Sequence, residues 1–179
     1  MPIIQTRRLT LVPFTLELVR AALRDREEFG RMLAARVPND WPNDDVLSML
    51  PQDAVLLEAA PQRSDWSYLV VHTGERSLIG DIGFHAPPDA NGSVEIGYDI
   101  LTAHRGQGYA VEAGEALLDW AFQQPGARFV VAESLVDNVA SMRVLEKLGL
   151  RRLSTTAESI WWRLTREEWL DGSERRKSP

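Results

Sequence analysis

The sequence contains no cysteine, and only three of its 179 residues are histidine. Disulfide bonds, cysteine-based zinc sites and a cysteine nucleophile are therefore excluded. His72, His85 and His104 are not three or four positions apart, so we expect no histidine-only metal site and no bound metal. No apolar run reaches the roughly 20 residues that a membrane helix requires, and the first residues lack the apolar block of a signal peptide. We expect a cytoplasmic protein with no membrane partner.

A basic face is also missing, since the formal net charge is -6. This charge argues against a nucleic-acid partner and is compatible with a cationic or amine substrate, without proving one. Hydrophobic residues make up 44% of the chain, which is typical of a globular protein large enough to bury a core. We therefore expect a single domain over residues 1–179, with a disordered tail at 172–179.

The first half of the chain combines a strand pattern with several helix signals. Residues 7–14 alternate and predict a strand that ends at Pro13. A helical pattern follows, with Thr15 as its N-cap and Leu16, Val19 and Leu23 on one face. In residues 30–65, prolines at 38, 42, 51 and 61 predict short helices, one of them capped by Asn43, and we expect a substrate-facing lid there.

From residue 66 the period changes to two. Residues 66–72, 77–84 and 94–101 predict strands, with a turn at Gly74 and an Asn-Gly hairpin signal at 91–92. Residues 127–136 predict a strand inside a sheet, residues 137–150 a helix closed by Gly149, and residues 160–164 a last strand. Thr165 and Glu168 predict a capping box for a final helix. This order indicates an α/β (α+β) fold with a mixed sheet.

The stretch "HRGQGYA" (residues 104–110) leads directly into a long helical pattern. A helix start offers up to about four unpaired N–H groups and a partial positive charge, which favour an anion. Gly106 and Gly108 permit close approach, and Arg105 can add a charge-assisted contact. The stretch therefore predicts a pyrophosphate site, or else only a glycine-rich turn that begins a helix. It is neither a P-loop nor a dinucleotide fingerprint, because the required spacing is absent.

The flanking residues carry a resemblance. "VEIGYDILTAHRGQGYAVEAGEALLDWAF" and then "LVDNVASMRVLEKLGL" resemble the core of the GNAT acetyltransferase superfamily, with Arg105, Gly108 and Ala110 matching its loop pattern. "TRRLTLVPFT" and "WWRLTREEW" resemble the RimJ/RimL-like branch, which acetylates ribosomal proteins. The resemblance covers nearly the whole chain and is weakest over residues 30–65. It implies a single GNAT-like domain whose mixed, mostly antiparallel sheet is splayed to admit acetyl-CoA.

The resemblance also implies which residues bind this cosubstrate. The pantetheine arm would pair with free backbone groups of Asp99, Ile100 and Leu101, in the manner of an added strand. The pyrophosphate would lie on the loop amides of Arg105, Gly106, Gln107, Gly108, Tyr109 and Ala110.

Acetyl transfer to an amine requires a neutral amine, a donor to the thioester oxygen and a proton for the thiolate. For the base we favour Glu95, acting through water beside Gly97, although it could equally be an exposed or ion-paired structural residue. Glu133 is the second candidate. We assign Glu112 and Glu115 to the helix dipole or to solvent.

The general acid is harder to place. Many superfamily members have a tyrosine seven positions after the residue that matches Asn138, but here that position is Leu145. The branch suggests Ser141 near the sulfur instead, whereas its hydroxyl could also satisfy only local backbone groups. Asn138 would hydrogen-bond the pantetheine or merely cap its helix.

The acceptor stays open between a protein or peptide N-terminus and a small-molecule amine. Residues 38–45 place three aspartates beside Trp41, which could attract a cation or form a solvated, helix-capping loop. Trp161 and Trp162 face opposite ways, so one belongs in the core. A homodimer involving Gly114 and the last strand is left open. The alternatives to an N-acetyltransferase acting in a ternary complex are a non-catalytic CoA-binding regulatory module and an unrelated enzyme with a similar phosphate loop.

Overall fold

The computed structural model describes residues 2–177. They form two compact units: the first unit contains residues 2–83 and 98–113, and the second contains residues 84–97 and 114–177. Strand β5 (Ser93–Ile100) and helix α4 (Tyr109–Ala121) each begin in one unit and end in the other. The predicted pyrophosphate loop therefore belongs to the first unit.

Antiparallel strands in the order β1-β2-β3-β4 form the sheet of the first unit. They are β1 (Ile4–Gln5), β2 (Leu9–Pro13), β3 (Ser67–His72) and β4 (Ser77–Phe84). Three of these strands confirm the sequence prediction, but β1 was not predicted, because two residues are too few to show a period. The sheet brings the N-terminal residues of the chain into the unit that holds the loop.

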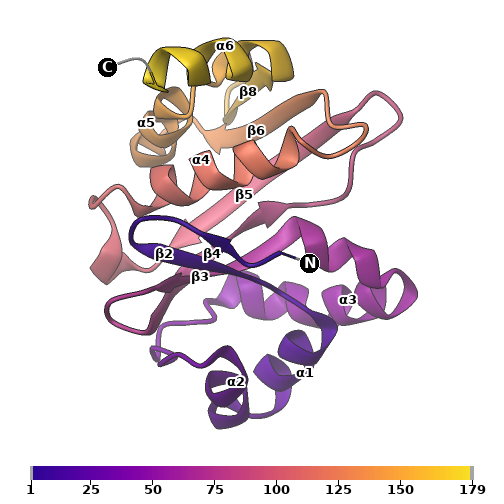
Figure 1. Ribbon diagram of the computed structural model, residues 1–179, viewed down its shortest axis with the longest axis vertical. Helices are drawn as coiled ribbons and strands as arrows, with labels where there is room; N and C mark the ends of the chain where they lie inside the picture. The colour runs from indigo at the N-terminus through magenta and orange to yellow at the C-terminus, as the bar shows by residue number, and fades with distance from the viewer. Residues whose placement is uncertain (1, 178–179) are drawn as a thin grey trace. The chain divides into compact units, whose positions relative to one another are not determined.

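Helices α1 (Leu16–Arg24), α2 (Arg26–Leu33) and α3 (Asp44–Ala59) complete this unit with the short 3-10 helix η1 (Pro61–Trp66) (Figure 1). Thr15 caps α1, as predicted, because its side chain accepts the amide of Leu18. The predicted apolar face of α1 is partly wrong: Val19 is buried, but Leu23 is 40% exposed. Since α1 packs against both α2 and α3, it is Leu18 and Ala21 that are buried beside Val19.

Helix α3 differs from the predicted run of short helices. It continues through Pro51, although proline removes one amide hydrogen bond from a helix. Pro51 and Leu47, four residues earlier, are both exposed, so water can satisfy the Leu47 carbonyl. The predicted cap is confirmed, because the Asn43 side chain accepts the amide of Val46 at 2.8 Å.

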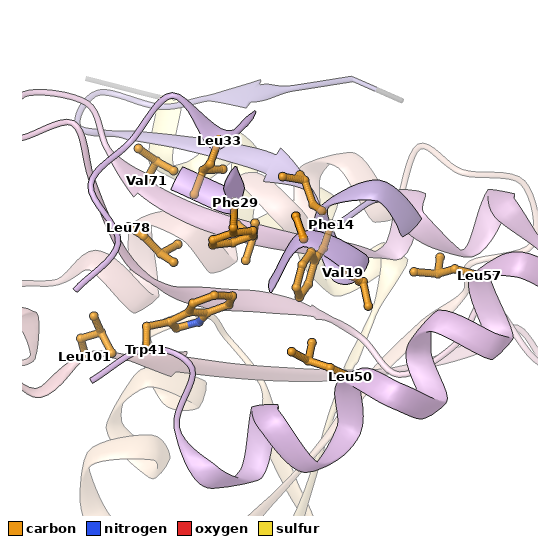
Figure 2. Close-up of a cluster of buried hydrophobic side chains, with 13 residues drawn as sticks. Phe14, Val19, Phe29, Leu33, Trp41, Leu50, Leu57, Val71, Leu78 and Leu101 are labelled. Atoms are coloured by element: carbon orange, nitrogen blue, oxygen red, sulfur yellow. The ribbon is translucent and has the colours of Figure 1, made fainter. Parts of the chain in front are cut away.

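A cluster of buried aliphatic side chains with three aromatic rings among them forms the core between these helices and the sheet of the first unit (Figure 2). Phe29 stacks on Trp41 with ring centroids 4.8 Å apart, and Phe14 lies tilted against both rings. Burying such side chains contributes about 1.5–3 kcal/mol each. The irregular segment around Trp41 is therefore anchored in the core.

The second unit is built around the strand order β5-β6-β8-β7. Strands β6 (Phe129–Leu135), β7 (Arg151–Thr155) and β8 (Ser159–Thr165) pair antiparallel, while β5 and β6 are parallel. The predicted mixed, mostly antiparallel sheet is confirmed, and β6 lies inside it. The parallel register ends at Glu95 and Val131, although both strands continue beyond these residues.

Helices α5 (Val139–Lys147) and α6 (Arg166–Lys177) belong to the second unit, with the larger part of α4. The capping box of α6 is confirmed, because Thr165 and Glu168 exchange hydrogen bonds of 2.9 and 3.1 Å. The last residue of α5 is followed by a turn at Gly149, whose φ is 88°. One tryptophan of the predicted pair is buried: Trp162 donates its indole N–H to Ser134.

Two predictions for this unit are wrong. Strand β7 was missed, because all five of its residues are exposed and show no alternation. The expected disordered tail is instead largely helical, since α6 continues to Lys177; residues 178 and 179 lie outside the described residues. Glutamate, arginine and lysine follow Gly172 in the sequence, and all are good helix formers.

Candidate active site

The predicted pyrophosphate loop is an exposed turn that begins at the end of β5. After a 3-10 turn (η2, Thr102–His104), Gly106 and Gly108 adopt φ angles of 74° and 82°, which non-glycine residues rarely tolerate. Helix α4 begins directly after them, at Tyr109. A turn in which residues of positive and negative φ alternate, as they do at residues 106–108, can form a concave backbone that presents its N–H groups to an anion.

The loop amides are free to bind such an anion. Among the described residues, none of the amides of residues 106–111 donates a hydrogen bond within the protein, and the first helical bond runs from Glu112 to Gly108, at 3.0 Å. The positive end of the α4 dipole lies at the same place. The loop therefore offers hydrogen-bond donors to an anion, and residues 105–108 are exposed to solvent.

The Arg105 side chain folds back towards β5. Its Nε donates to the Ile100 carbonyl at 2.6 Å and its Nη2 to Asp99 Oδ1 at 2.9 Å, while the other Asp99 oxygen accepts from the Asn43 amide at 3.0 Å. Asp99 thus joins the loop to the N-terminus of α3. The Leu101 amide donates to the Ile79 carbonyl, and the Leu101 carbonyl already accepts the His104 amide at 2.8 Å. A ligand could therefore use only the second lone pair of the Leu101 carbonyl.

Two residues of segment 38–45, which could attract a cation, have structural roles instead. Trp41 is buried and donates its indole N–H to Asp81 Oδ2 at 3.1 Å, and Asn43 caps α3. Burial raises the pKa of Asp81 to about 6, and the negative charge of Asp99 adds to this increase, against the opposing effect of the Trp41 bond. The three aspartates of this segment are exposed to solvent: Asp40, Asp44 and Asp45.

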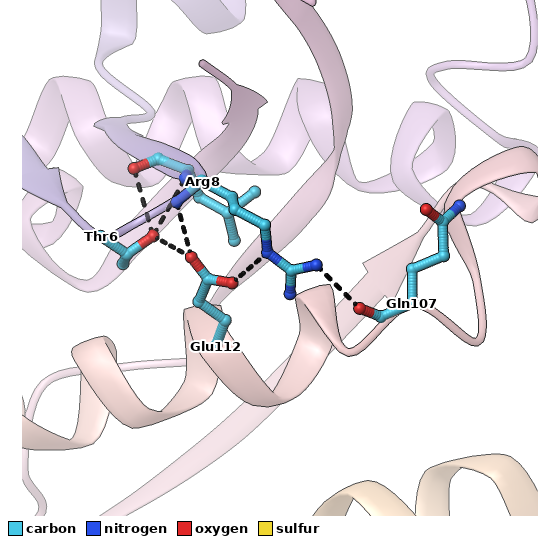
Figure 3. A network of polar contacts seen from close by, with 5 residues as sticks. Thr6, Arg8, Gln107 and Glu112 are labelled. Atoms are coloured by element: carbon cyan, nitrogen blue, oxygen red, sulfur yellow. Dashed lines mark hydrogen bonds and ion pairs between the residues drawn. The ribbon is translucent and has the colours of Figure 1, made fainter. Parts of the chain in front are cut away.

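Sequence reasoning missed a polar network that joins the N-terminal segment to the loop (Figure 3). Arg8 Nε contacts Glu112 Oε2 at 2.6 Å, and Arg8 Nη1 donates to the Gln107 carbonyl at 3.1 Å. Thr6 donates to the other Glu112 oxygen at 2.6 Å. No motif indicates this network, because its members are about a hundred residues apart. Glu112 was assigned to the dipole or to solvent and is instead bonded on both oxygens.

Tyr109 contributes to the loop through its backbone amide, because its side chain is buried. The ring lies edge-on to His72 and under the Arg8 guanidinium, whose carbon is 4.3 Å from the ring centroid. This packing fixes the first residue of α4. Ala110, also predicted to bind the cosubstrate, follows it in the first turn.

In the second unit, Glu95 has a histidine partner. His85 Nδ1 lies 3.6 Å from Glu95 Oε1, which is an ion-pair distance and too long for a direct hydrogen bond. A side chain on Gly97 would come within 3.1 Å of the His85 ring, so the glycine leaves room for the imidazole. The predicted alternation is confirmed, since Val94 and Ile96 are buried while Glu95 is half-buried.

The other predicted residues of this unit lie on β6 and α5. Asn138 caps α5 by accepting the amide of Ser141 at 3.0 Å, and Ser141 is half-buried in the first turn. Leu145, at the position of the absent tyrosine, is buried. Glu133 is exposed on β6 and pairs in register with Trp161.

Within the described residues, no three His, Asp or Glu side chains are grouped so that they could hold a metal ion. Across the same part of the chain, every helix is too short or too polar to cross a bilayer.

Comparison with known proteins gives the class of this chain. The family profile "Acetyltransferase (GNAT) domain" matches residues 8–151. YjdG of Bacillus subtilis strain 168, an uncharacterised N-acetyltransferase, is 30% identical over 163 residues, which are 90% of this chain and 97% of that protein. The class is therefore that of enzymes that transfer an acetyl group from acetyl-CoA to an amine. Within it, the chain belongs to the GNAT acetyltransferase family.

Solved structures show the same fold. The ribosomal-protein-S5-alanine acetyltransferase of Vibrio fischeri aligns with a TM-score of 0.67 at 14% identity, over 94% of this chain and 99% of that one. RimL, a ribosomal L7/L12 alpha-N-protein acetyltransferase solved with coenzyme A, aligns with a TM-score of 0.66 at 18% identity, over 93% and 99% of the two chains.

Proposed function

We propose that this N-acetyltransferase holds the pyrophosphate of acetyl-CoA on the loop of residues 105–110 and acetylates a primary amine. The observation that carries this proposal is the run of amides at residues 106–111 without protein acceptors, at a helix start with two glycines of positive φ. A helix N-terminus with such amides favours an anion by both hydrogen bonding and dipole.

The pantetheine arm would continue along β5. The backbone of Asp99, Ile100 and Leu101 stays our candidate for this contact, through groups that the protein leaves partly available. The Ile100 carbonyl already accepts from Arg105, but a carbonyl has a second lone pair. A parallel register that ends at Glu95, while β5 and β6 continue, is what a sheet splayed to admit acetyl-CoA requires. Asn138 retains its amide N–H groups for the same arm, because only its oxygen caps α5.

For the chemistry we propose Glu95 as the base, with His85 as its partner. A carboxylate next to an imidazole can accept the amine proton through one water molecule and share the resulting charge. Glu133 is the second candidate. Ser141 would hydrogen-bond the departing thiolate, a role that does not require it to be acidic. The amine attacks the thioester directly in a ternary complex, so that positioning supplies much of the rate.

For the acceptor we propose a protein N-terminus, as in the RimJ/RimL-like branch. The support comes from the names of the two structural neighbours, both acetyltransferases of ribosomal proteins. An α-amine has a pKa near 8 and needs less help from a base than a lysine or polyamine amine near 10. We further propose that the protein acts in the cytoplasm, as a single domain, where such acceptors are made.

The test combines calorimetry with acetyl-CoA and a thiol-release assay. The amine panel contains N-terminal peptides starting with alanine or serine, together with spermidine and free amino acids. Release of CoA with the peptides alone supports the proposed acceptor. Release of CoA with spermidine or free amino acids instead supports the acetyltransferase activity but assigns a different acceptor. Binding without release supports the regulatory module, and no binding of acetyl-CoA contradicts the loop assignment.

A further inference from the structure

Arg8 contacts the predicted pyrophosphate loop from a distant part of the sequence. Its Nη1 donates to the backbone carbonyl of Gln107 at 3.1 Å, in the middle of the loop. A side chain on Gly108 would lie 3.6 Å from its Nη2. The guanidinium thus packs along the backbone of the loop rather than at its exposed tip.

The contact with the Gln107 carbonyl has a consequence for the next amide. In a trans peptide the C=O and the following N–H point in opposite directions, and the planar bond resists rotation. A carbonyl held towards Arg8 therefore directs the Gly108 N–H away from Arg8. This amide is one of those without a protein acceptor. Glycines on both sides of Gln107 would otherwise let the peptide plane rotate, because glycine is the least restrained residue.

Arg8 itself is fixed by α4, the helix that the loop begins. Glu112, in the first turn, accepts the Arg8 backbone amide at 2.8 Å and its Nε at 2.6 Å (Figure 3). Thr6 adds a bond of 2.6 Å to the same carboxylate. Burial raises the pKa of Glu112, but the bonds from Thr6 and Arg8 outweigh it and keep that pKa below its usual value.

The Arg8–Glu112 pair is more enclosed than an ordinary surface ion pair. Its side chains are 30% and 16% exposed, compared with 47% and 68% for the pair of Arg20 and Glu58 in the same unit. Surface pairs contribute little, whereas a charge-assisted contact with restricted geometry orients its partners. The pair at Arg20 provides a matched control.

We propose that Arg8 is a positioning residue for acetyl-CoA, which acts through the Gln107 carbonyl to aim the Gly108 N–H at the pyrophosphate. The inference rests on the proposed function of the loop and assigns a role in binding to the N-terminal segment. Arg8 needs no contact with the phosphates for this role. Lysine would not replace it, because one ammonium group cannot reproduce the planar fork that serves the Glu112 carboxylate and the Gln107 carbonyl together.

The experiment measures binding of two probes, coenzyme A and pantetheine, which lacks the pyrophosphate. For Arg8→Ala we expect the affinity for coenzyme A to fall on the order of tenfold, the worth of one well-made hydrogen bond. The affinity for pantetheine should stay within about twofold of wild type. Arg8→Lys should lose coenzyme A affinity similarly, and Arg20→Ala should bind both probes like wild type. Circular dichroism and Tm verify that each variant is folded, and Arg8→Lys carries the test if Arg8→Ala is not.

The possible outcomes separate this inference from the proposed function. Wild-type protein that does not bind coenzyme A contradicts the function of the loop. Wild-type binding with unchanged affinity in folded Arg8→Ala leaves that function intact and overturns the role of Arg8. Full affinity in Arg8→Lys also overturns it, because positive charge alone would then suffice. An equal loss for both probes would show a general distortion and contradict action through the pyrophosphate.

Discussion

Replacing Asp81 with asparagine should stabilise the protein at neutral pH. Burial, reinforced by the charge of Asp99, raises the pKa of Asp81 from 3.8 to about 6, so ionised Asp81 destabilises the fold. This difference between the pKa of Asp81 in the folded and unfolded states lowers the free energy of unfolding by about 3 kcal/mol at pH 7. The pKa of about 6 already includes the stronger Trp41 bond to the charged carboxylate, and asparagine still accepts the Trp41 N–H. We expect a gain in stability of about 3 kcal/mol, or about 6–12 °C in Tm.

The sign of this effect depends on pH. Between about pH 4 and pH 6 the folded protein binds more protons at Asp81 than the unfolded chain does, so the raised pKa makes stability decrease as pH rises. Near pH 4 the side chain is protonated in the folded state, and the gain from Asp81→Asn should disappear. Urea unfolding from pH 4 to pH 8 measures this difference, with Asp40→Asn as an exposed control. A variant that is less stable than wild type at pH 7 would refute the reasoning, since the Trp41 bond would then outweigh the cost of burial.

Three further changes test other parts of the structure. Glu95→Gln should lower turnover by about a hundredfold or more below pH 7, and the gap should narrow as pH approaches the pKa of the amine; a pH–rate profile parallel to wild type would remove Glu95 from the mechanism. Gly80→Ala should unfold the first unit or lower its stability by more than about 4 kcal/mol, because the added Cβ would lie 2.1 Å from the Asp99 carbonyl oxygen. Circular dichroism and urea unfolding measure the loss. Wild-type stability in this variant would show that β4 and β5 separate easily here. Thr165→Ala should cost about 1 kcal/mol in urea unfolding through loss of the α6 capping box, and an unchanged midpoint would mean that α6 contributes little to global stability.

Local signals were the part of the fold that could be predicted. Thr15, Asn43 and the capping box at Thr165 were identified because a cap lies within three residues of the amide that it satisfies. The alternation of β5 was equally clear, since its period is set by the backbone. The prediction of short helices around Pro51 was wrong, because the free-energy cost of a proline in a helix depends on solvent exposure, which a sequence does not show.

The contacts around the candidate site could not be predicted in the same way. Arg8 and Glu112, Trp41 and Asp81, and Asn43 and Asp99 are each separated by dozens of residues. Single polar side chains carry no period that would indicate a distant partner. The loop itself was readable because its glycines and the helix that follows are contiguous. The contact of this loop with Arg8 of the N-terminal segment was indicated by no motif.

The division of the chain has a consequence for synthesis. The last segment of the first unit is residues 98–113, and it is made only after residues 84–97, which belong to the second unit. A nascent chain that ends at Gly83 therefore lacks the loop, the start of α4 and the acceptor for Arg8. Because the N-terminal part of a chain is synthesised first, the first helices and strands are made before residues 98–113, which complete their unit. A stall between residues 83 and 104 would leave Phe14, Phe29 and Trp41 of the core synthesised but the predicted pyrophosphate loop absent.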